Sequence, residues 1–256
     1  MRVSVLASGS GGNVCVVESG GTRVLVDAGL SGREIERRLT ARGIEAESIA
    51  AIFVTHEHQD HSSGALAFST RFDCPIYATA GTADALGLEG DLFSPFIRIE
   101  PSREGRIGAL GFRPFATPHD ANESVAYAFE ADDARIVVAS DLGRAEEAFI
   151  EFVRDATALL LEFNHDEDML RDGPYTWPLK RRISGGWGHL SNRQSAEVVR
   201  RAAGPKLRRV VATHLSRTNN TPPLALAALS EALERSGWPV PFEAADQISG
   251  YEAFEA

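Results

Sequence analysis

Three histidines and one aspartate lie within a single hexapeptide of this chain, His56-Glu57-His58-Gln59-Asp60-His61. The hexapeptide follows the mainly apolar run 50–55, which predicts a buried strand. Imidazoles at alternate positions of a strand end can point the same way, while Asp60 and His61 turn into the next segment. Mixed imidazole and carboxylate ligands suit borderline divalent ions such as zinc. These four ligands exceed what one closed tetrahedral site needs, so the pattern favours two adjacent metals that share a nucleophilic water.

Three further ligand-type residues, His119, Asp141 and His214, each follow an apolar strand pattern. Strand ends present side chains at the rim of a sheet, and any one of these residues alone would suit a hydrogen-bonded rim position. Together with the hexapeptide they give enough ligands for two metals and a bridging carboxylate. The candidate set is His56, His58, Asp60, His61, His119, Asp141 and His214.

The elements that must position these residues alternate between strands and helices. Strands are expected at 3–6, 14–18, 23–26, 75–77, 97–100, 110–116, 125–130, 135–139, 158–163 and 209–213. Helices are expected at 31–43, 64–72, 82–86, 146–152, 191–203 and 221–237, two of them opened by the capping boxes Ser31-x-x-Glu34 and Ser191-x-x-Gln194. Two runs of strands with helices after each favour two sheets packed face to face with helices outside both. We therefore predict an αββα four-layer sandwich forming a single domain over residues 1–256.

Composition narrows the classes of partner. The net charge of −10 argues against a general polyanion binder, but two divalent ions would add positive charge where a phosphate must lie. No stretch approaches the roughly 20 apolar residues of a membrane span, and no long apolar signal-peptide region opens the chain. The two cysteines, Cys15 and Cys74, form no CxxC motif. We expect a reduced cytoplasmic protein without a membrane partner.

The order Asp27, His-x-His-x-Asp-His, His119, Asp141 and His214 resembles the metallo-β-lactamase superfamily, and the resemblance covers nearly the whole chain. It implies the αββα fold. It also implies a first metal held by His56, His58 and His119, and a second held by Asp60, His61 and His214, with Asp141 bridging both. Asp27 matches the first motif of the superfamily, where this residue supports the ligand loop rather than binding metal.

Longer motifs resemble one branch, the bacterial YycJ/WalJ-like metallo-hydrolases. They are Leu6-Ala7-Ser8-Gly9-Ser10-Gly11-Gly12-Asn13, Val26-Asp27-Ala28-Gly29-Leu30-Ser31, Glu162-Phe163-Asn164-His165-Asp166, Trp177-Pro178-Leu179-Lys180-Arg181-Arg182-Ile183, Gly188-His189-Leu190-Ser191-Asn192 and Thr213-His214-Leu215-Ser216-Arg217-Thr218-Asn219-Asn220. Gln59 and Phe163 depart from the smaller residues usual in that branch. The resemblance implies a phosphodiester hydrolase, specifically a 5′–3′ exonuclease acting on DNA, with two divalent ions of zinc, manganese or iron.

The resemblance implies a role for His189, and residue type and local pattern predict roles for several other residues. His189 would act as general acid on the leaving oxygen, with Asp60 and Asp141 serving the metal-held nucleophile; the alternative for His189 is a helix-start histidine bonded to backbone. His165 would either orient a ligand or cap the following turn. Lys180, Arg181, Arg182 and Arg217 would hold phosphates. Ser10 and Asn13 belong to a Gly-rich loop that lacks the Gly-Lys-Ser/Thr of a P-loop, so we expect a tight turn whose N–H groups reach a phosphate.

Three alternatives remain at the level of sequence. The same ligands suit an RNase Z-like nuclease that processes tRNA or other RNA, or a phosphodiesterase acting on small molecules. A non-catalytic metal-binding or nucleic-acid-binding module belongs to a different class. It would bind metal without turning over any phosphodiester, although a purely structural site seldom needs seven ligands.

Overall fold

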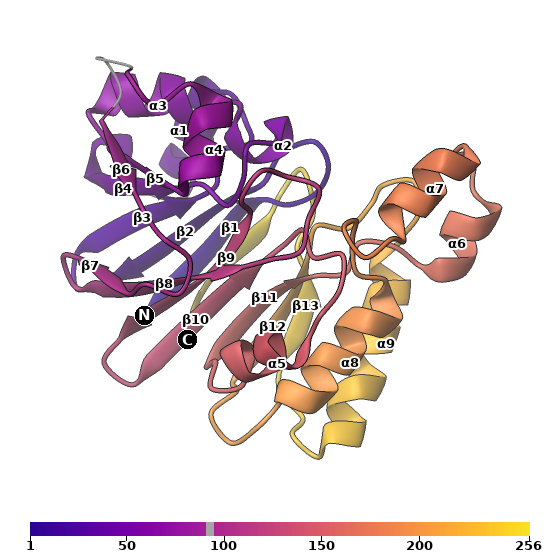
Figure 1. Ribbon diagram of the computed structural model, residues 1–256. Coiled ribbons are helices and arrows are strands. Elements are labelled where there is room, and N and C mark those ends of the chain that lie inside the picture. Colours follow the sequence, from indigo (N-terminus) through magenta and orange to yellow (C-terminus); the bar gives the residue numbers. More distant parts are fainter. Residues whose placement is uncertain (91–94) are drawn as a thin grey trace.

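The computed structural model describes residues 1–90 and 95–256, and within them two seven-stranded sheets face each other with helices on both outer sides (Figure 1). This arrangement confirms the predicted αββα sandwich. None of the helices in the described residues combines the length and apolar composition needed to cross a membrane.

The first sheet carries the N-terminal part of the chain and the last strand. Its strands are β1 (Arg2–Ala7), β2 (Val14–Ser19), β3 (Thr22–Val26), β4 (Ile49–Phe53), β5 (Ile76–Ala78), β6 (Phe96–Arg98) and β14 (Tyr251–Glu255), in the order β14-β1-β2-β3-β4-β5-β6. Helices α1 (Gly32–Thr40), α3 (Ala65–Phe72) and α4 (Ala80–Leu86) lie on its outer face. A short 3-10 turn at Ala46–Ser48 leads into β4.

The second sheet is built from the middle and C-terminal parts of the chain. Its strands are β7 (Gly105–Ile107), β8 (Leu110–Ala116), β9 (Val125–Ala131), β10 (Ala134–Ala139), β11 (Ala158–Glu162), β12 (Arg209–Thr213) and β13 (Phe242–Ala244), in the order β13-β12-β11-β10-β9-β8-β7. Helices α5 (Glu147–Val153), α8 (Asn192–Ala202) and α9 (Pro222–Ser236) cover its outer face.

The central strands are buried on both faces, which explains why their sequences are continuously apolar. In β11, Leu160 faces the core between the two sheets, whereas Leu159 and Leu161 face the core under α5, α8 and α9. Aromatic rings fill the space between the sheets, and the Phe53 ring contacts those of Tyr77, Phe112, Tyr127 and Phe129. The stacked sheets therefore give the rim a rigid base.

Several elements escaped the sequence prediction. The short strands β7, β13 and β14 were not expected, and neither were α6 (Glu167–Asp172) and α7 (Trp177–Ile183), which project beside the rim as an arm (Figure 1). Helix α7 contains no buried residue, so it lacks the apolar stripe that marks a helix in sequence. β14 pairs with β1 across the length of the chain, a partnership that no local pattern indicates.

One of the two predicted capping boxes is complete. Ser191 accepts a hydrogen bond from the Gln194 amide, and the Gln194 side chain accepts one from the Ser191 amide. Ser31 caps α1 because its hydroxyl accepts a hydrogen bond from the Glu34 amide. The prediction of a full capping box is wrong here, because the Glu34 carboxylate does not accept the second bond from the Ser31 amide. That carboxylate instead accepts bonds from Arg37 and Arg38, because charged donors compete better than a backbone amide.

Candidate metal centre

The candidate ligands gather where the carboxyl ends of neighbouring strands meet at one rim. Strands β3 and β4 are parallel, and β10, β11 and β12 are parallel, so their ends deliver side chains to the same edge of each sheet. Asp27 and His214 follow β3 and β12 directly, Asp141 comes two residues after the end of β10, and each has a left-handed backbone with φ between 53° and 61°. Backbone strain of this kind is uncommon outside glycine and concentrates at functional sites.

All seven predicted ligands come together. Their nitrogen and oxygen atoms fall into four overlapping groups, with the atoms of each group within 4.8 Å of one another. The groups are His56, His58 and His119; His56, His61 and Asp141; Asp60, His61 and His214; and Asp141, Glu162, His189 and His214. Six of these residues line a cavity of about 230 Å³: His58, Asp60, His119, Asp141, His189 and His214.

In the group of His56, His58 and His119, hydrogen bonds on one ring nitrogen leave the other nitrogen available to a metal. His119 Nδ1 donates to the Gly188 carbonyl at 3.0 Å, which leaves Nε2 as the lone-pair nitrogen, 3.3 Å from Nδ1 of His58. His56 Nδ1 lies 3.0 Å from the Thr55 hydroxyl, while its Nε2 is buried without any hydrogen-bond partner. A buried imidazole nitrogen without a partner is costly unless a ligand completes it.

Asp141 lies between this group and the second one. Its Oδ1 is 3.5 Å from Nε2 of His119, and its Oδ2 is 3.1 Å from Nε2 of His61. Asp60 Oδ2 lies 3.5 Å from the same His61 nitrogen and 3.4 Å from Nε2 of His214. Asp141 is buried, and its two oxygen atoms face nitrogen atoms of both groups. This donor set, together with the unpartnered Nε2 of His56, fits divalent metal ions.

The electrostatics of the centre favour positive charge. Burial opposes protonation of His61, but Asp141 and Asp27 outweigh burial and hold its pKa well above 6.5. Burial likewise opposes the charge on His214, yet Asp141, Asp60 and Glu162 raise its pKa to about 10. Burial and the neighbouring His61 hold the pKa of His56 well below its ordinary value. A pocket that keeps protons on two buried imidazoles would equally stabilise a cation that replaces them.

The ligand loop is held from below by Asp27. Its Oδ1 accepts a bond from the Thr55 amide at 2.8 Å, and its Oδ2 lies 2.7 Å from Nδ1 of His61, which turns Nε2 of that ring towards the centre. Nearby, Gly29 has to be glycine, because a Cβ there would lie 1.7 Å from the carbonyl oxygen of Asp60. The Asp27–Gly29 segment thus fixes the start of α2 (Gln59–Ser62), which carries two of the ligands.

Glu162 is a residue of the centre that we did not predict. It is fully buried, and its Oε1 accepts bonds from the amides of Leu142 and Leu190 at 2.7 and 3.0 Å. Its Oε2 lies 3.1 Å from Nδ1 of His189 and 3.5 Å from Nδ1 of His214. Burial opposes its charge, but His189 and His214 outweigh burial and lower the pKa of Glu162 to about 2. An acid that ends the apolar run of β11 was the available signal.

His189 itself lies at the cavity, 20% exposed, and its Nδ1 faces Glu162 and also lies 3.5 Å from Asp141. This ring is therefore oriented by a carboxylate rather than by backbone. The His165 ring, in contrast, has a buried Nδ1 without a partner, and burial lowers its pKa to about 4. Asp166, not His165, caps α6, so the capping role considered for His165 is wrong.

The predicted phosphate-binding residues are dispersed. Arg182 lines the cavity and pairs with Asp120, which also lines it. Lys180 and Arg181 do not line it, and Lys180 Nζ donates to the Arg171 carbonyl. Arg217 lines a neighbouring cavity that shares Ser216 with this one. Of the residues of helix α7, only Leu179, Arg182 and Ile183 line the cavity.

Hydrogen bonds within the protein hold the Gly-rich loop in place. Ser10 lines the cavity, but the Asn13 side chain is buried and its Nδ2 donates to the carbonyls of Gly9 and Asp60. The amides of Gly9, Gly11 and Gly12 are bonded internally, to Asn13, Gln247 and Gly9 respectively. The expectation that the loop amides meet a phosphate is therefore wrong for these three glycines, since their donors are already used. For the Ser10 amide it stays a prediction.

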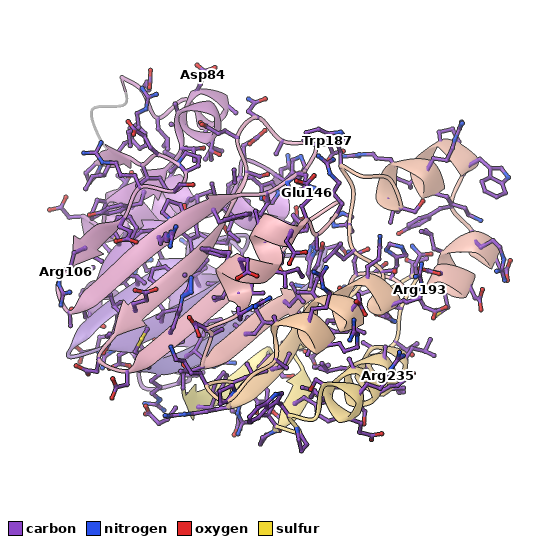
Figure 2. All side chains as sticks on the ribbon, turned by 60° about the horizontal axis from the view of Figure 1, so that its bottom comes forward. Asp84, Arg106, Glu146, Trp187, Arg193 and Arg235 are labelled. Atoms are coloured by element: carbon purple, nitrogen blue, oxygen red, sulfur yellow. The ribbon has the colours of Figure 1, made fainter. Side chains whose placement is uncertain are left out.

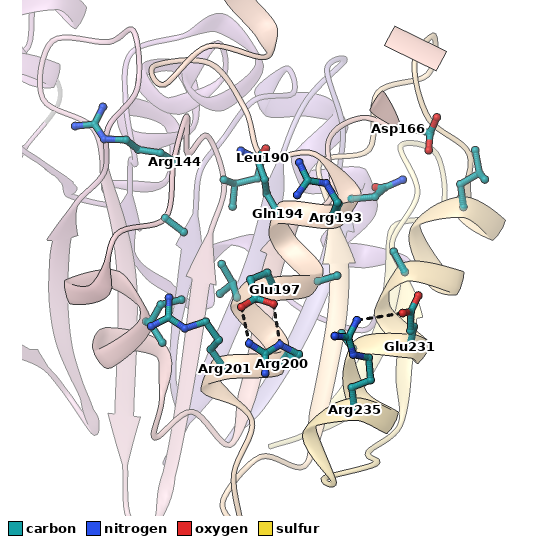
Figure 3. A pocket seen from close by; sticks show the side chains of 18 residues that line it. Arg144, Asp166, Leu190, Arg193, Gln194, Glu197, Arg200, Arg201, Glu231 and Arg235 are labelled. Carbon is teal, nitrogen blue, oxygen red and sulfur yellow. Dashed lines mark hydrogen bonds and ion pairs between the residues drawn. The ribbon is translucent and has the colours of Figure 1, made fainter. Parts of the chain in front are cut away.

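A larger cavity, about 620 Å³, lies between α8 and α9 (Figure 3). Its arginines are matched by neighbouring acids, including Arg200 with Glu197 and Arg235 with Glu231. None of the four ligand groups found in the described residues lies there. Its chemistry is that of a solvated, ion-paired helix surface, so the smaller cavity is the candidate active site.

Comparison with known proteins agrees with this geometry. Residues 22–215 match the model of the Beta-lactamase superfamily domain. The exodeoxyribonuclease WalJ of Streptococcus pneumoniae is 36% identical over 88% of this chain and 85% of its own length. The exodeoxyribonuclease YycJ of Bacillus anthracis is 33% identical over 94% of this chain and 92% of its own length.

A solved structure supports the same fold. The metallo-beta-lactamase fold protein YhfI from Bacillus subtilis superposes with a TM-score of 0.76 at 16% identity, over 100% of this chain and 99% of that one. At this identity the likeness concerns the fold alone. The sequence matches and the ligand geometry together show that this chain belongs to the beta-lactamase superfamily, in the family that contains the WalJ and YycJ proteins.

Proposed function

We propose that this protein hydrolyses phosphodiester bonds in nucleic acid, as a 5′–3′ exonuclease acting on DNA, with two divalent metal ions. The observation that carries the proposal is the position of Asp141, whose two oxygen atoms face His119 and His61 from opposite groups of ligands. The names of the WalJ and YycJ relatives support the reaction and the substrate. Zinc and manganese suit this donor set best, with iron as a further option.

The first ion would be held by His56, His58 and His119, and the second by Asp60, His61 and His214, with Asp141 shared. When bound, the ions supply an acidified water as nucleophile and neutralise charge on the phosphoryl oxygens. The side chains of the protein fix where that happens. Asp27 and Gly188 hold two of the imidazoles in the tautomer that leaves Nε2 free.

His189 is the proton donor in this proposal. Its Nδ1 faces Glu162, so Nε2 is the nitrogen available to protonate the departing oxygen. The Glu162 carboxylate, fixed by two backbone amides, stabilises the imidazolium before the proton leaves. A positioned general acid of this kind contributes a factor of ~10²–10⁴ in rate.

Arg182 binds the phosphate backbone beside the cleaved bond. It lines the cavity from α7, and Asp120 holds its guanidinium in place. The chain as a whole carries a net charge of −10, so attraction of a polyanion has to come from such local cations and the ions. Binding should accordingly weaken as salt concentration rises.

The test is a set of labelled substrates given to protein that has been stripped of metal and reloaded with zinc, manganese or iron. We expect release of labelled mononucleotides from the 5′ end of a DNA duplex. The His61→Ala variant should lose turnover while keeping a circular dichroism spectrum near wild type. Cleavage of a precursor tRNA without degradation of DNA would instead indicate an RNase Z-like activity. Bound metal without turnover of any phosphodiester, bis-nitrophenyl phosphate included, would indicate a non-catalytic module.

A further inference from the structure

Trp187 is a large aromatic side chain left in solvent beside the metal centre. Trp187 is 58% exposed and precedes His189 by two positions. Trp177 and Trp238 are also exposed, so exposure alone does not distinguish Trp187. Its place in the chain does, because it lies two residues before a histidine that lines the metal cavity.

The backbone around Trp187 is rigidly held. The Trp187 carbonyl accepts a bond from the Asp120 amide at 2.9 Å, and the Gly188 amide donates to Gly185 at 2.9 Å. From the other side, Gly143 approaches so closely that a Cβ there would lie 2.3 Å from the Trp187 nitrogen. The exposed ring therefore stands on a fixed base, which lowers the entropy that a ligand would lose on stacking against it.

A cavity of about 340 Å³ opens along this ring. Trp187, Phe115 and Pro118 give it apolar walls, and Arg144 and Thr117 add polar groups. Two of its lining residues are close in sequence to residues that line the metal cavity, since Pro118 precedes His119 and Trp187 leads through Gly188 to His189. The same two chain segments therefore line both cavities.

Arg144 and Glu146 are the two charged residues that line the cavity. The Arg144 guanidinium lies 5.1 Å from the centroid of the Trp187 ring, and its Nη1 donates to the Gly186 carbonyl at 3.1 Å. Glu146 accepts a hydrogen bond from Nε of Arg144 at 2.6 Å and lines the same cavity. Figure 2 labels Trp187 and Glu146 near each other, and Figure 3 shows Arg144 among the residues of the larger cavity, which it also lines. An arginine stacked on an aromatic ring next to an apolar slot suits a nucleotide, whose base is flat and whose phosphate is anionic.

We propose that this cavity is a nucleobase subsite, in which a base of the substrate strand near the cleaved phosphodiester stacks on Trp187 while Arg144 faces an adjacent phosphate. The inference rests on the proposed function and adds to it that the enzyme grips the strand through its bases as well as its backbone. Stacking of this kind tolerates any base, because every base offers a π face. The subsite therefore provides affinity and positioning without sequence preference.

The experiment combines the metal-loaded protein with oligonucleotides that carry one abasic residue at the first, second or third position from the 5′ end. For wild-type protein we expect one of these positions to raise KM about tenfold relative to the intact strand. Anisotropy of the same labelled strands on metal-free protein should show a matching loss of affinity. The Trp187→Ala variant should show a KM for the intact strand that is raised by about the same factor. This variant should then give the same KM for the intact and the abasic strand, which is the coupling expected of a direct contact.

Two variants serve as controls. Trp187→Phe keeps a stacking surface and should retain most of the discrimination. Trp238→Ala removes another exposed tryptophan, 44% exposed and outside both cavities, and should behave as wild type. Equal KM for intact and abasic strands with wild-type protein, or undiminished discrimination by Trp187→Ala, overturns the subsite while leaving the nuclease intact. A wild-type protein that neither binds nor degrades any strand overturns the proposed function and the subsite together.

Discussion

The metal cavity and the larger groove between α8 and α9 differ in how their charges are satisfied. In the groove of about 620 Å³, Arg200 lies 2.6 Å from Glu197 and Arg235 lies 3.3 Å from Glu231, each within one exposed helix. At the cavity of about 230 Å³, four overlapping groups of metal-ligating atoms meet, and Nε2 of His56 in one of them is buried without a partner. Local pairs satisfy the groove already, whereas the ligand groups are complete only with bound cations. Clustered ligand atoms therefore identify the active site better than volume does.

The largest effect is expected for a substitution of Asp141 in the metal cavity. Asp141→Asn keeps the size of the side chain but removes the shared charge, so we expect turnover to fall by ~10³ or more, a factor within the range that single groups contribute to transition-state stabilisation. Metal content, measured by elemental analysis, should fall below that of wild type. A variant with full activity and full metal content would show that Asp141 is not shared between the two groups.

The second largest effect is expected at Glu162. In Glu162→Gln an amide oxygen can still accept from Leu142 and Leu190, but the charge facing His189 is gone. We expect kcat to fall about a hundredfold with little change in KM, because general acid catalysis is worth ~10²–10⁴. Glu167→Gln, which removes an exposed acid of α6, is the matched control. Steady-state kinetics that place the loss in KM alone would contradict this role.

Removal of metal should expose the protonation of His214. The folded pKa of His214, about 10, lies above its ordinary 6.5, because Asp141, Asp60 and Glu162 outweigh burial. The stabilisation from this proton is complete below pH 6.5 and is lost as pH rises towards 10. Chelated protein should thus show a falling Tm over this range, whereas metal-loaded protein should not, since the ions replace the proton. A Tm of chelated protein that stays level from pH 7 to 10 would refute the expectation.

A smaller effect is expected at Arg182. Arg182→Ala should raise KM for DNA about tenfold and lower the slope of log affinity against log salt by about one. Arg181→Ala is an instructive neighbour, because Arg181 does not line the cavity, and its effect should be smaller. Equal losses of DNA affinity in the two variants would mean that the basic residues of α7 attract DNA through their summed charge rather than through one contact of Arg182.

The smallest effects belong to the groove. Arg200→Ala and Arg235→Ala remove exposed helix pairs, which solvent screens, so the free energy of unfolding should stay close to that of wild type. Nuclease activity should stay within about twofold of wild type. Denaturant unfolding and the DNA assay measure both. A large loss of activity would give the groove a part in catalysis and end the contrast between the two sites.

The metal ligands could be predicted from the sequence because four follow one apolar strand within a hexapeptide and the other three each follow a strand of their own. This signal is local and visible without tertiary structure. Glu162 also ends such a strand, but its role depends on His189 and His214, which reach it only through folding. Asn13 and Lys180 were assigned to the substrate by residue type, whereas hydrogen bonds to Gly9 and Arg171 direct them elsewhere. Local pattern therefore predicts which residue types reach the rim, and packing decides which way they face.

The left-handed backbone at Asp27, Asp141 and His214 has a consequence for engineering. Aspartate, asparagine, histidine and glycine tolerate this conformation, whereas β-branched residues adopt it at considerable cost. A library that varies the rim should therefore sample asparagine and glycine at these positions and omit valine, isoleucine and threonine. Selection of such a library for heat resistance alone would be expected to enrich glycine there, giving sturdier proteins that no longer work as enzymes.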